Sequence, residues 1–251
     1  MVKQKLAIIG AKDLPATGGA SRSIEYLLPL LSEHFDITIY LLQDAGIEIS
    51  LRSRINVILT PAFAGKRLRT LSYYLFSTFH ALLRSNYDLV YVQHLYSGFI
   101  IPLLKLRFKT ILTVHGLIPK NDAKWTRLDK IAFNAIERLF SMSPDALTSV
   151  SKIHLYYLES ISKREVVYIP NCIDTKIIRE IKEIHSVQRI TFSAARIIPL
   201  KGCHIMLEAL RMLSFKGEVA IIGDYEQIPA YKEQLLGLAS GLSVTFKGLF
   251  T

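Results

Sequence analysis

Two adjacent glycines, Gly18 and Gly19, end the loop that follows the first apolar run of the chain and precede a helical pattern. A glycine pair lets the backbone approach a ligand closely and expose its N–H groups. The N-terminus of the helix behind it adds a partial positive charge. These features indicate a phosphate site, although the same pair would also suit an ordinary tight turn.

Two cations in the last quarter of the chain could bind the same kind of ligand. Arg196 follows an apolar run that ends in small residues, and Lys201 stands five residues later, where a helical pattern begins. Arginine can bind two oxygens at once, whereas lysine acts as a point charge. Ligands of an open parallel sheet bind at the carboxyl ends of its strands. We therefore expect both cations to face Gly18 and Gly19 across a diphosphate; simple solvation is the alternative.

The net charge of +10 is unevenly distributed. Between residues 49 and 121 there are ten lysines and arginines but a single acid, Asp88. Such a field attracts phosphates on a small molecule, an anionic membrane or a nucleic acid. A merely soluble basic surface is an equal alternative. No recognised nucleic-acid motif accompanies the charge, so we expect no nucleic-acid partner.

Several classes of protein are excluded. The longest uncharged apolar stretch, Leu89–Leu104, is shorter than the roughly 20 residues of a membrane span. The N-terminus lacks the long apolar core of a secretory signal, which indicates a cytoplasmic protein. Cys172 and Cys203 have no CxxC spacing and are expected to be free thiols. No HExxH, EF-hand or Cys/His ladder is present, so we expect no metal.

Short apolar runs alternate with helical patterns over the first two thirds of the chain. Most of the runs are continuously apolar, which is typical of parallel strands buried on both faces. The expected strands are 5–10, 36–42, 55–60, 88–93, 109–116, 145–151 and 165–171. The expected helices are 20–33, 66–85, 122–142 and 151–161. This alternation predicts a doubly wound α/β domain.

The alternation starts again after a mixed, charged segment at 172–187. Strands are expected at 189–195, 218–224 and 242–248, with helices at 201–213 and 229–239. The sequence therefore predicts two domains, 1–170 and 171–251. The second is shorter than the roughly 100–150 residues of a Rossmann-like domain, so we expect it to be incomplete.

Four stretches are similar to motifs of a known family. They are "LPATGGAS" at 14–21, "LTVHG" at 112–116, "YIPNCIDT" at 168–175 and "AARIIPLKGCHIMLEAL" at 194–210. In this order and spacing the chain resembles the retaining family 4 (group 1) glycosyltransferases. The resemblance implies the GT-B fold, in which two Rossmann-like domains with parallel sheets face each other. It also implies metal-independent, retaining sugar transfer from a nucleotide-sugar donor, which is a co-substrate and not a cofactor, to a lipid-linked or polysaccharide acceptor.

The resemblance implies roles for particular residues. Arg196 and Lys201 would bind the donor diphosphate and stabilise its charge as the sugar leaves. Gly18 and Gly19 would line the other wall of the diphosphate site. His115, at the end of a strand, would lie beside the sugar and the acceptor, and we count it with the two cations as catalytic. The alternative for His115 is a histidine that is simply satisfied at a strand end.

The hinge between the domains and the end of the chain depart from the family pattern. Asn171 and Asp174 would form the interdomain hinge, or they are ordinary turn formers. Cys172 stands where the family usually has glycine. The family's pair of glutamates seven residues apart, which holds the donor, would lie beyond Thr251. A truncated, non-catalytic remnant with a basic membrane-binding surface is therefore the alternative function.

The helical pattern at 66–84 could contact a membrane. Basic, aromatic helices lie on anionic membrane surfaces. The cations of this segment are Lys66, Arg67, Arg69 and Arg84, and its aromatic residues include Tyr73, Tyr74, Phe76 and Phe79. We expect peripheral attachment to the inner face of the cell membrane; an aromatic stripe that faces the core is the alternative. A Rossmann oxidoreductase is a weaker third class, because G-x-G-x-x-G and its distal acid are absent.

Overall fold

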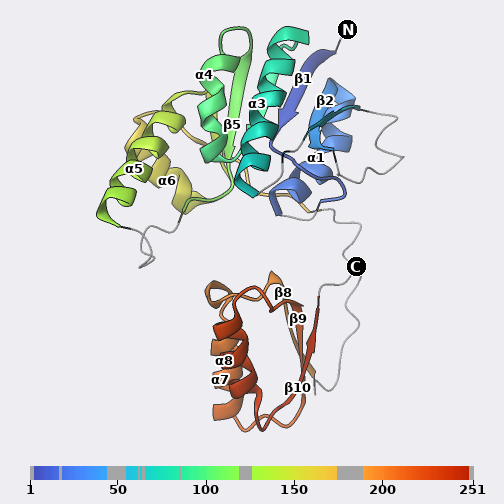
Figure 1. Ribbon diagram of the computed structural model, residues 1–251, viewed down its shortest axis with the longest axis vertical. Coiled ribbons are helices and arrows are strands. Elements are labelled where there is room, and N and C mark those ends of the chain that lie inside the picture. Colours follow the sequence, from blue (N-terminus) through green and yellow to red (C-terminus); the bar gives the residue numbers. More distant parts are fainter. Residues whose placement is uncertain are drawn as a thin grey trace. The chain divides into compact units, whose positions relative to one another are not determined.

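The chain forms two compact units in the computed structural model, residues 1–178 and 179–251 (Figure 1). The structure describes residues 3–16, 19–43, 55–61, 63, 66–84, 86–118, 126–173 and 189–248. The sequence analysis placed the domain boundary between residues 170 and 171, whereas the two units divide between 178 and 179.

Unit 1 is built on a parallel sheet of seven strands, in the order β3-β2-β1-β4-β5-β6-β7. The strands are β1 (Gln4–Ile9), β2 (Phe35–Leu42), β3 (Asn56–Thr60), β4 (Leu89–Gln93), β5 (Lys109–Val114), β6 (Ala146–Ser149) and β7 (Val167–Tyr168). The order and the uniform direction are those of a doubly wound sheet. The α/β class predicted from the sequence is confirmed.

Helices cover both faces of this sheet. They are α1 (Gly19–His34), α3 (Lys66–Arg84), η1 (Leu95–Ile100), α4 (Ile101–Leu104), α5 (Arg127–Met142) and α6 (Lys152–Ser162). In β1, Leu6 and Ile8 pack in one buried cluster with α1, while Ala7 and Ile9 belong to a second cluster with α3, η1, α4 and α6. Both faces are buried, which explains why the strands read as continuously apolar.

The structure corrects two details of the sequence analysis. The segment 95–104, considered there only as part of a membrane span, forms η1 and α4. The strands β6 and β7 are shorter than expected. The last backbone hydrogen bond between them runs from the Ile169 amide to the Ser149 carbonyl, because Pro170, the next residue, has no amide hydrogen.

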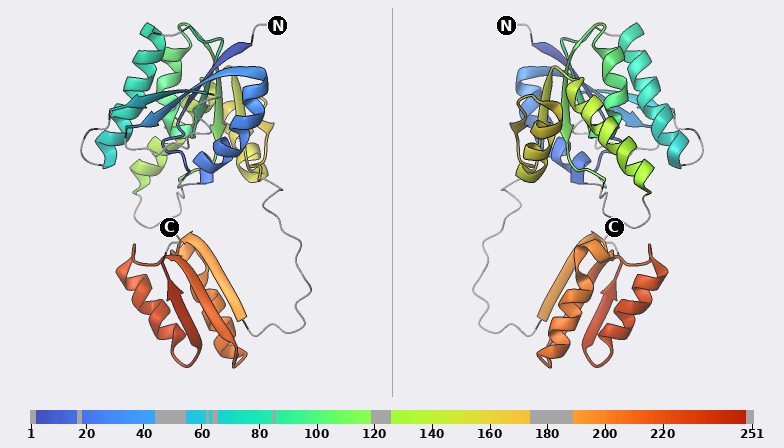
Figure 2. Two further views of the ribbon diagram at one scale, coloured as in Figure 1. Left: turned by 90° about the vertical axis from the view of Figure 1, so that its right-hand side faces the viewer. Right: turned by 90° about the vertical axis from the view of Figure 1, so that its left-hand side faces the viewer.

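Unit 2 contains a three-stranded parallel sheet in the order β10-β9-β8. Its elements are β8 (Arg189–Arg196), η3 (Pro199–Lys201), α7 (Cys203–Met212), β9 (Glu218–Asp224), α8 (Pro229–Ala239) and β10 (Ser243–Lys247). Both helices lie on one side of this sheet (Figures 1 and 2). The helix expected at 201 begins at Cys203, because Gly202 has a left-handed φ of 75° that separates η3 from α7.

We expect Gly10→Ala to destabilise unit 1. Gly10 has a φ of 116°, and an added Cβ would lie 2.6 Å from the Gln93 Cβ. Backbone strain and overpacking together predict a loss of about 2–4 kcal/mol in the free energy of unfolding. Chemical denaturation followed by circular dichroism measures it. The control Gly116→Ala, whose Cβ would meet nothing within 4 Å, should change stability by less than about 0.5 kcal/mol. Equal stability of the two variants would contradict the prediction.

Candidate functional site

The middle of the sheet in unit 1 provides a natural place for a ligand. β1 and β4 are neighbours, but the chain runs from β1 to β2 on one side and from β4 to β5 on the other. A crevice forms at the carboxyl ends of the strands where the strand order reverses in this way. The residues that follow β1, β4 and β5 include Lys12, His94 and His115.

A cavity of about 800 Å³ lies at this position. Its lining combines one amine with aromatic rings, small hydroxyls and a leucine. The lining residues are Lys12, Thr70, Leu71, Tyr74, His94, Tyr96, Ser97 and Phe99. They come from the ends of β1 and β4, from the first half of α3 and from η1, so four parts of the chain form one site.

Lys12 supplies the positive charge of the cavity. Its Nζ donates to Thr70 Oγ1 over 3.1 Å and lies 5.6 Å from the centre of the Tyr74 ring. Burial lowers the pKa of Lys12, the Asp13 carboxylate partly opposes this, and the Arg69 guanidinium lowers the pKa further. A partly desolvated ammonium attracts an anion more strongly than one in open water. Lys12 is therefore suited to an anionic group of a ligand.

His94 lines the cavity with Lys12, and the His115 ring lies next to it, with the two ring centres 5.3 Å apart. Burial, followed by the charge of His94, lowers the pKa of His115 from 6.5 to about 4. Burial, followed by the charge of Lys12, lowers the pKa of His94. Both rings are therefore neutral at neutral pH and can each donate or accept a hydrogen bond with a hydroxyl group. Within the described ranges, no group of three or more His, Cys, Asp or Glu could hold a metal ion.

His94 has an unusual backbone conformation. Its φ of 72° and ψ of 131° are rare for a residue other than glycine. The His94 amide donates to the Thr113 carbonyl over 2.9 Å, and Ser97 Oγ lies 2.6 Å from the carbonyl oxygens of both Gln93 and His94. Strained residues of this kind cluster at functional sites. The sequence analysis missed His94, although its place at the end of a strand was a signal.

Gln93 precedes His94, contacts His115 and is fully buried. Its Oε1 is 2.5 Å from His115 Nε2. In the part of the chain that the structure describes, Gln93 Nε2 and His115 Nδ1 are buried and have no hydrogen-bond partner. Buried polar atoms are rarely left in this state, so an ordered water or a ligand hydroxyl would be well accommodated here.

A buried carboxylate braces the loop that follows His115. Glu137 of α5 accepts hydrogen bonds from Tyr96 at 2.6 Å and from Tyr157 at 2.7 Å. The Tyr96 hydroxyl in turn accepts the Ile118 amide hydrogen over 3.0 Å. Burial, followed by the hydrogen bond to Glu137, raises the pKa of Tyr96, so it stays a neutral donor. These hydrogen bonds thus join η1, which follows β4, to the loop and α5, which follow β5, and to α6, which follows β6.

The two cations expected to bind the diphosphate lie at the carboxyl edge of the sheet in unit 2. Arg196 is the last residue of β8, opposite Asp224 in the register of β8 and β9, and Lys201 is the last residue of η3. Both residues are exposed. Gly223 allows the backbones of β8 and β9 to approach closely at this edge, because a Cβ there would lie 1.8 Å from the Ala194 carbonyl oxygen.

The structure tests the other expected site residues only in part. Gly18 and Asp174 lie outside the described residues. Gly19 is the first residue of α1, and an added Cβ would meet nothing within 4 Å. Asn171 is exposed after β7, one residue before Cys172, whose Sγ lies 4.0 Å from the Ser23 carbonyl oxygen. The approach of Gly18 and Gly19 to the two cations of unit 2 stays a prediction.

The helix expected at a membrane divides its aromatic residues between two faces. Tyr73 and Tyr74 are buried, so the core-facing alternative holds for them, whereas 38% of Phe76 and 50% of Phe79 are exposed. Arg84 is exposed. Arg69 is partly buried close to Lys12, and the side chains of Lys66 and Arg67 are outside the described set. None of the described helices is long and apolar enough to cross a membrane.

The sequence of the chain matches one known protein family. A family model described as Glycosyltransferase Family 4 matches residues 17–177. The chain belongs to glycosyltransferase family 4. The match covers the sheet of unit 1 from α1 onward, which includes the Lys12 cavity apart from Lys12 itself. The resemblance seen in the sequence motifs is thereby confirmed. Among curated protein sequences, none matches significantly.

Solved structures with the GT-B fold resemble the family 4 chain along nearly its whole length. Sucrose-phosphate synthase from Thermosynechococcus elongatus is 18% identical, with a TM-score of 0.76, and the match covers 99% of this chain and 71% of that one. HepE from Anabaena, in complex with UDP and glucose, is 13% identical, with a TM-score of 0.65 and coverages of 99% and 70%. The lipopolysaccharide outer core galactosyltransferase WaaB is 13% identical, with a TM-score of 0.62 and coverages of 98% and 68%.

We expect His115 to titrate far below an ordinary histidine. Its pKa of about 4 in the folded protein means that only the unfolded chain takes up this proton as the pH falls below 6.5. The folded state is then disfavoured, so this contribution to stability is lost progressively between pH 6.5 and 4. NMR titration of the imidazole, assigned by its loss in His115→Gln, measures the pKa. A midpoint near 6.5 would show that the ring is not desolvated.

Proposed function

We propose that this chain transfers a sugar, with retention and without a divalent metal, from a nucleotide-sugar donor to an acceptor bound in the Lys12 cavity. The observation that carries the proposal is the position of that cavity. It lies at the switch point of a family 4 sheet. The neutral ring of His94 lines it together with the Lys12 ammonium, and the neutral ring of His115 lies next to His94. Such a site can orient hydroxyl groups and bind an anionic part of the acceptor.

The donor diphosphate is assigned to Arg196 and Lys201, together with the backbone of Gly18 and Gly19. Preorganised donors at a leaving diphosphate contribute on the order of 3–4 kcal/mol each to lowering the barrier. The complex of HepE with UDP and glucose makes UDP-glucose the first donor to test. His115 is placed beside the transferred sugar, where a neutral imidazole can donate to or accept from a hydroxyl.

A lipid-linked acceptor is favoured by the way the cavity meets the surface. Leu71 lines the cavity and is also 45% exposed on the outer side of α3. That side carries a row of exposed apolar residues. The row is Leu68, Leu71, Phe76, Phe79 and Leu83. An acceptor whose phosphate contacts Lys12 could therefore leave its apolar chain on α3.

The same side of α3 supports peripheral attachment to the inner face of the cell membrane. Arg107, an exposed cation from the turn after α4, lies near the end of the apolar row, where it donates a hydrogen bond to the Leu82 carbonyl. Arg84 adds a second exposed cation there. A helix with an apolar outer face and flanking cations is attracted to anionic lipid surfaces.

We expect Arg196→Ala to weaken UDP-glucose binding at least tenfold, because a charge-assisted contact with the diphosphate is lost. Lys201→Ala should have a smaller effect in the same direction, because a point charge makes one contact. Isothermal titration calorimetry measures both. The matched control is Arg189→Ala at the opposite end of the same strand, where Arg189 pairs with Glu218. Equal losses in Arg189→Ala and Arg196→Ala would contradict the assignment, and binding without any transfer would favour the non-catalytic remnant.

We expect Leu68→Ser to reduce binding to anionic vesicles. Leu68 is 61% exposed at the start of the apolar row, and its burial in lipid would contribute about 1.5–3 kcal/mol. Co-sedimentation at low and high salt measures the effect. Ile153→Ser on α6 changes a residue that is 79% exposed and serves as the control. If the two variants bind equally well, or if the parent chain ignores anionic vesicles at low salt, the membrane contact is wrong.

A further inference from the structure

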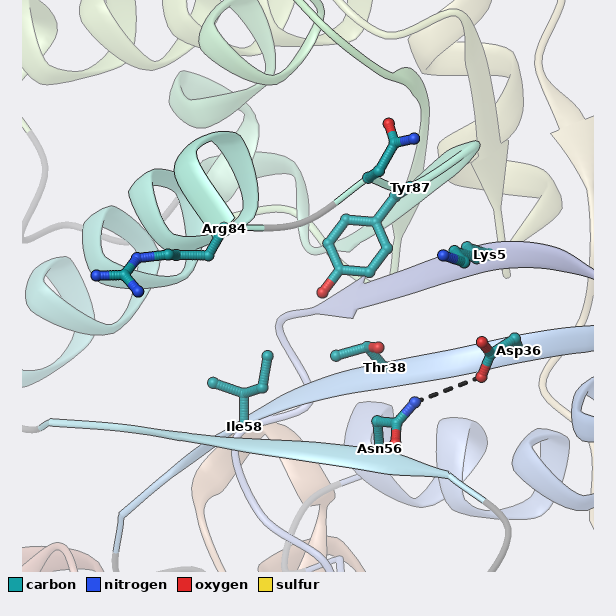
Figure 3. A pocket seen from close by; sticks show the side chains of 8 residues that line it. Lys5, Asp36, Thr38, Asn56, Ile58, Arg84 and Tyr87 are labelled. Atoms are coloured by element: carbon teal, nitrogen blue, oxygen red, sulfur yellow. Dashed lines mark hydrogen bonds between the residues drawn. The ribbon is translucent and has the colours of Figure 1, made fainter.

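Two further cavities of unit 1 share one side chain, Arg84, at the end of α3. The first, of about 280 Å³, lies at the amino ends of β1, β2 and β3 (Figure 3). Its lining residues are Lys5, Asp36, Thr38, Asn56, Ile58, Arg84, Asn86 and Tyr87. The second, of about 540 Å³, is lined by Phe76, Phe79, His80, Leu83 and Arg84. The first cavity is polar and the second mainly apolar, and both lie at the opposite end of α3 from the Lys12 cavity.

The polar cavity carries more positive than negative charge. Its lining includes Lys5 and Arg84 but one carboxylate, Asp36, which accepts a hydrogen bond from Asn56 Nδ2 over 3.4 Å. Neither the Lys5 ammonium nor the Arg84 guanidinium has a hydrogen bond or an ion pair with any residue that the structure describes. Figure 3 shows the Tyr87 hydroxyl directed into the space above Thr38 and Ile58. An anionic group with a polar substituent matches this arrangement.

Arg84 has no partner among the described residues, and another arginine completes the end of its helix. The last carbonyls of a helix need partners, and a cation in the last turn commonly provides one. Here the Arg107 guanidinium donates to the Leu82 carbonyl and packs 5.7 Å from the centre of the Phe108 ring. Arg84, the last residue of α3, is therefore available for a ligand, and its planar guanidinium suits the oxygens of a phosphate.

Three hydrogen-bonded side chains connect a lining residue of one cavity to a lining residue of the other. The Tyr87 hydroxyl lies 3.1 Å from that of Tyr40, which lies 3.2 Å from His80 Nδ1. The His80 ring stacks on Phe76 with ring centres 6.1 Å apart. Tyr40 is fully buried and Tyr87 nearly so. Tyr87 of the polar cavity and His80 of the apolar cavity are therefore linked through Tyr40, and Arg84 lines both cavities.

We propose that these two cavities together bind one membrane phospholipid. Its phosphate contacts Arg84, its polar headgroup enters the cavity of Lys5, Asp36 and Asn56, and its acyl chain lies on Phe79 and the neighbouring apolar side chains of α3. The site rests on the proposed membrane attachment and adds a specific lipid contact to it. The excess positive charge of the polar cavity complements the phosphate of a lipid. A lipid fits better than free phosphate, because free phosphate would occupy the polar cavity and leave the apolar cavity empty.

The test uses the full chain and a short-chain phosphatidylglycerol, below its micelle concentration, in isothermal titration calorimetry. We expect saturable binding of one lipid per chain. Arg84→Gln should weaken it about tenfold or more through loss of the charged contact. Phe79→Ser should also weaken it, through loss of apolar contact. Arg127→Gln, which removes an exposed cation at the start of α5, is the matched control and should bind as the parent does.

Three outcomes would overturn the proposal. Equal weakening in Arg84→Gln and Arg127→Gln would show a general effect of charge. Full competition by inorganic phosphate, with Phe79→Ser unchanged, would show an anion site that takes no lipid. Absence of saturable binding by the parent chain would show that no site exists. UDP-glucose affinity and vesicle binding of Leu68→Ser, measured in parallel, report separately on the proposed function, and thermal melts confirm that each variant is folded.

Discussion

One close contact between neighbouring strands sets the geometry of unit 1. Gly10 lies so near Gln93 that no side chain fits between the ends of β1 and β4. The Gly10 amide donates to the Tyr73 hydroxyl over 2.7 Å, and that hydroxyl donates to the Tyr40 carbonyl over 2.8 Å. Tyr73 is fully buried, which raises its pKa well above the ordinary value and keeps it a donor. A single phenol thus fixes α3 to the ends of β1 and β2.

This attachment determines where the rest of α3 lies. Thr70 and Tyr74 flank Tyr73 on the helix and form the wall that holds the Lys12 ammonium. Phe76, Phe79 and Leu83 face outward on the following turns, and Arg84 ends the helix at the opposite edge of the sheet. One helix therefore contributes to the proposed acceptor cavity, to the proposed membrane face and to the two cavities proposed to bind a lipid. Moving it would disturb all three.

The sequence predicted the parts that depend on local pattern. Continuous apolar runs located the strands. Arg196 and Lys201 were singled out because they follow a strand, whereas His115 was singled out through the family resemblance. The sequence could not divide the aromatic residues of α3 between core and surface, because the hydrogen bonds of the buried Tyr73 hydroxyl join it to Gly10 and Tyr40, 63 and 33 residues away in the chain. His94 and Lys12 were missed for a similar reason. Their importance comes from adjacency of β1, β4 and β5, which spacing along the chain does not reveal.

The pKa values of His94 and His115 each depend on a neighbouring residue of the Lys12 cavity. The Lys12 ammonium lowers the pKa of His94, and His94 in turn lowers that of His115, while burial lowers the pKa of all three. An anion bound at Lys12 would offset the ammonium charge and raise the pKa of His94. The cavity would then hold a proton more readily when the anionic part of an acceptor is present than when it is empty. Binding of charge and proton affinity are thus coupled through Lys12, which is why one lysine at the end of β1 can influence an imidazole at the end of β5.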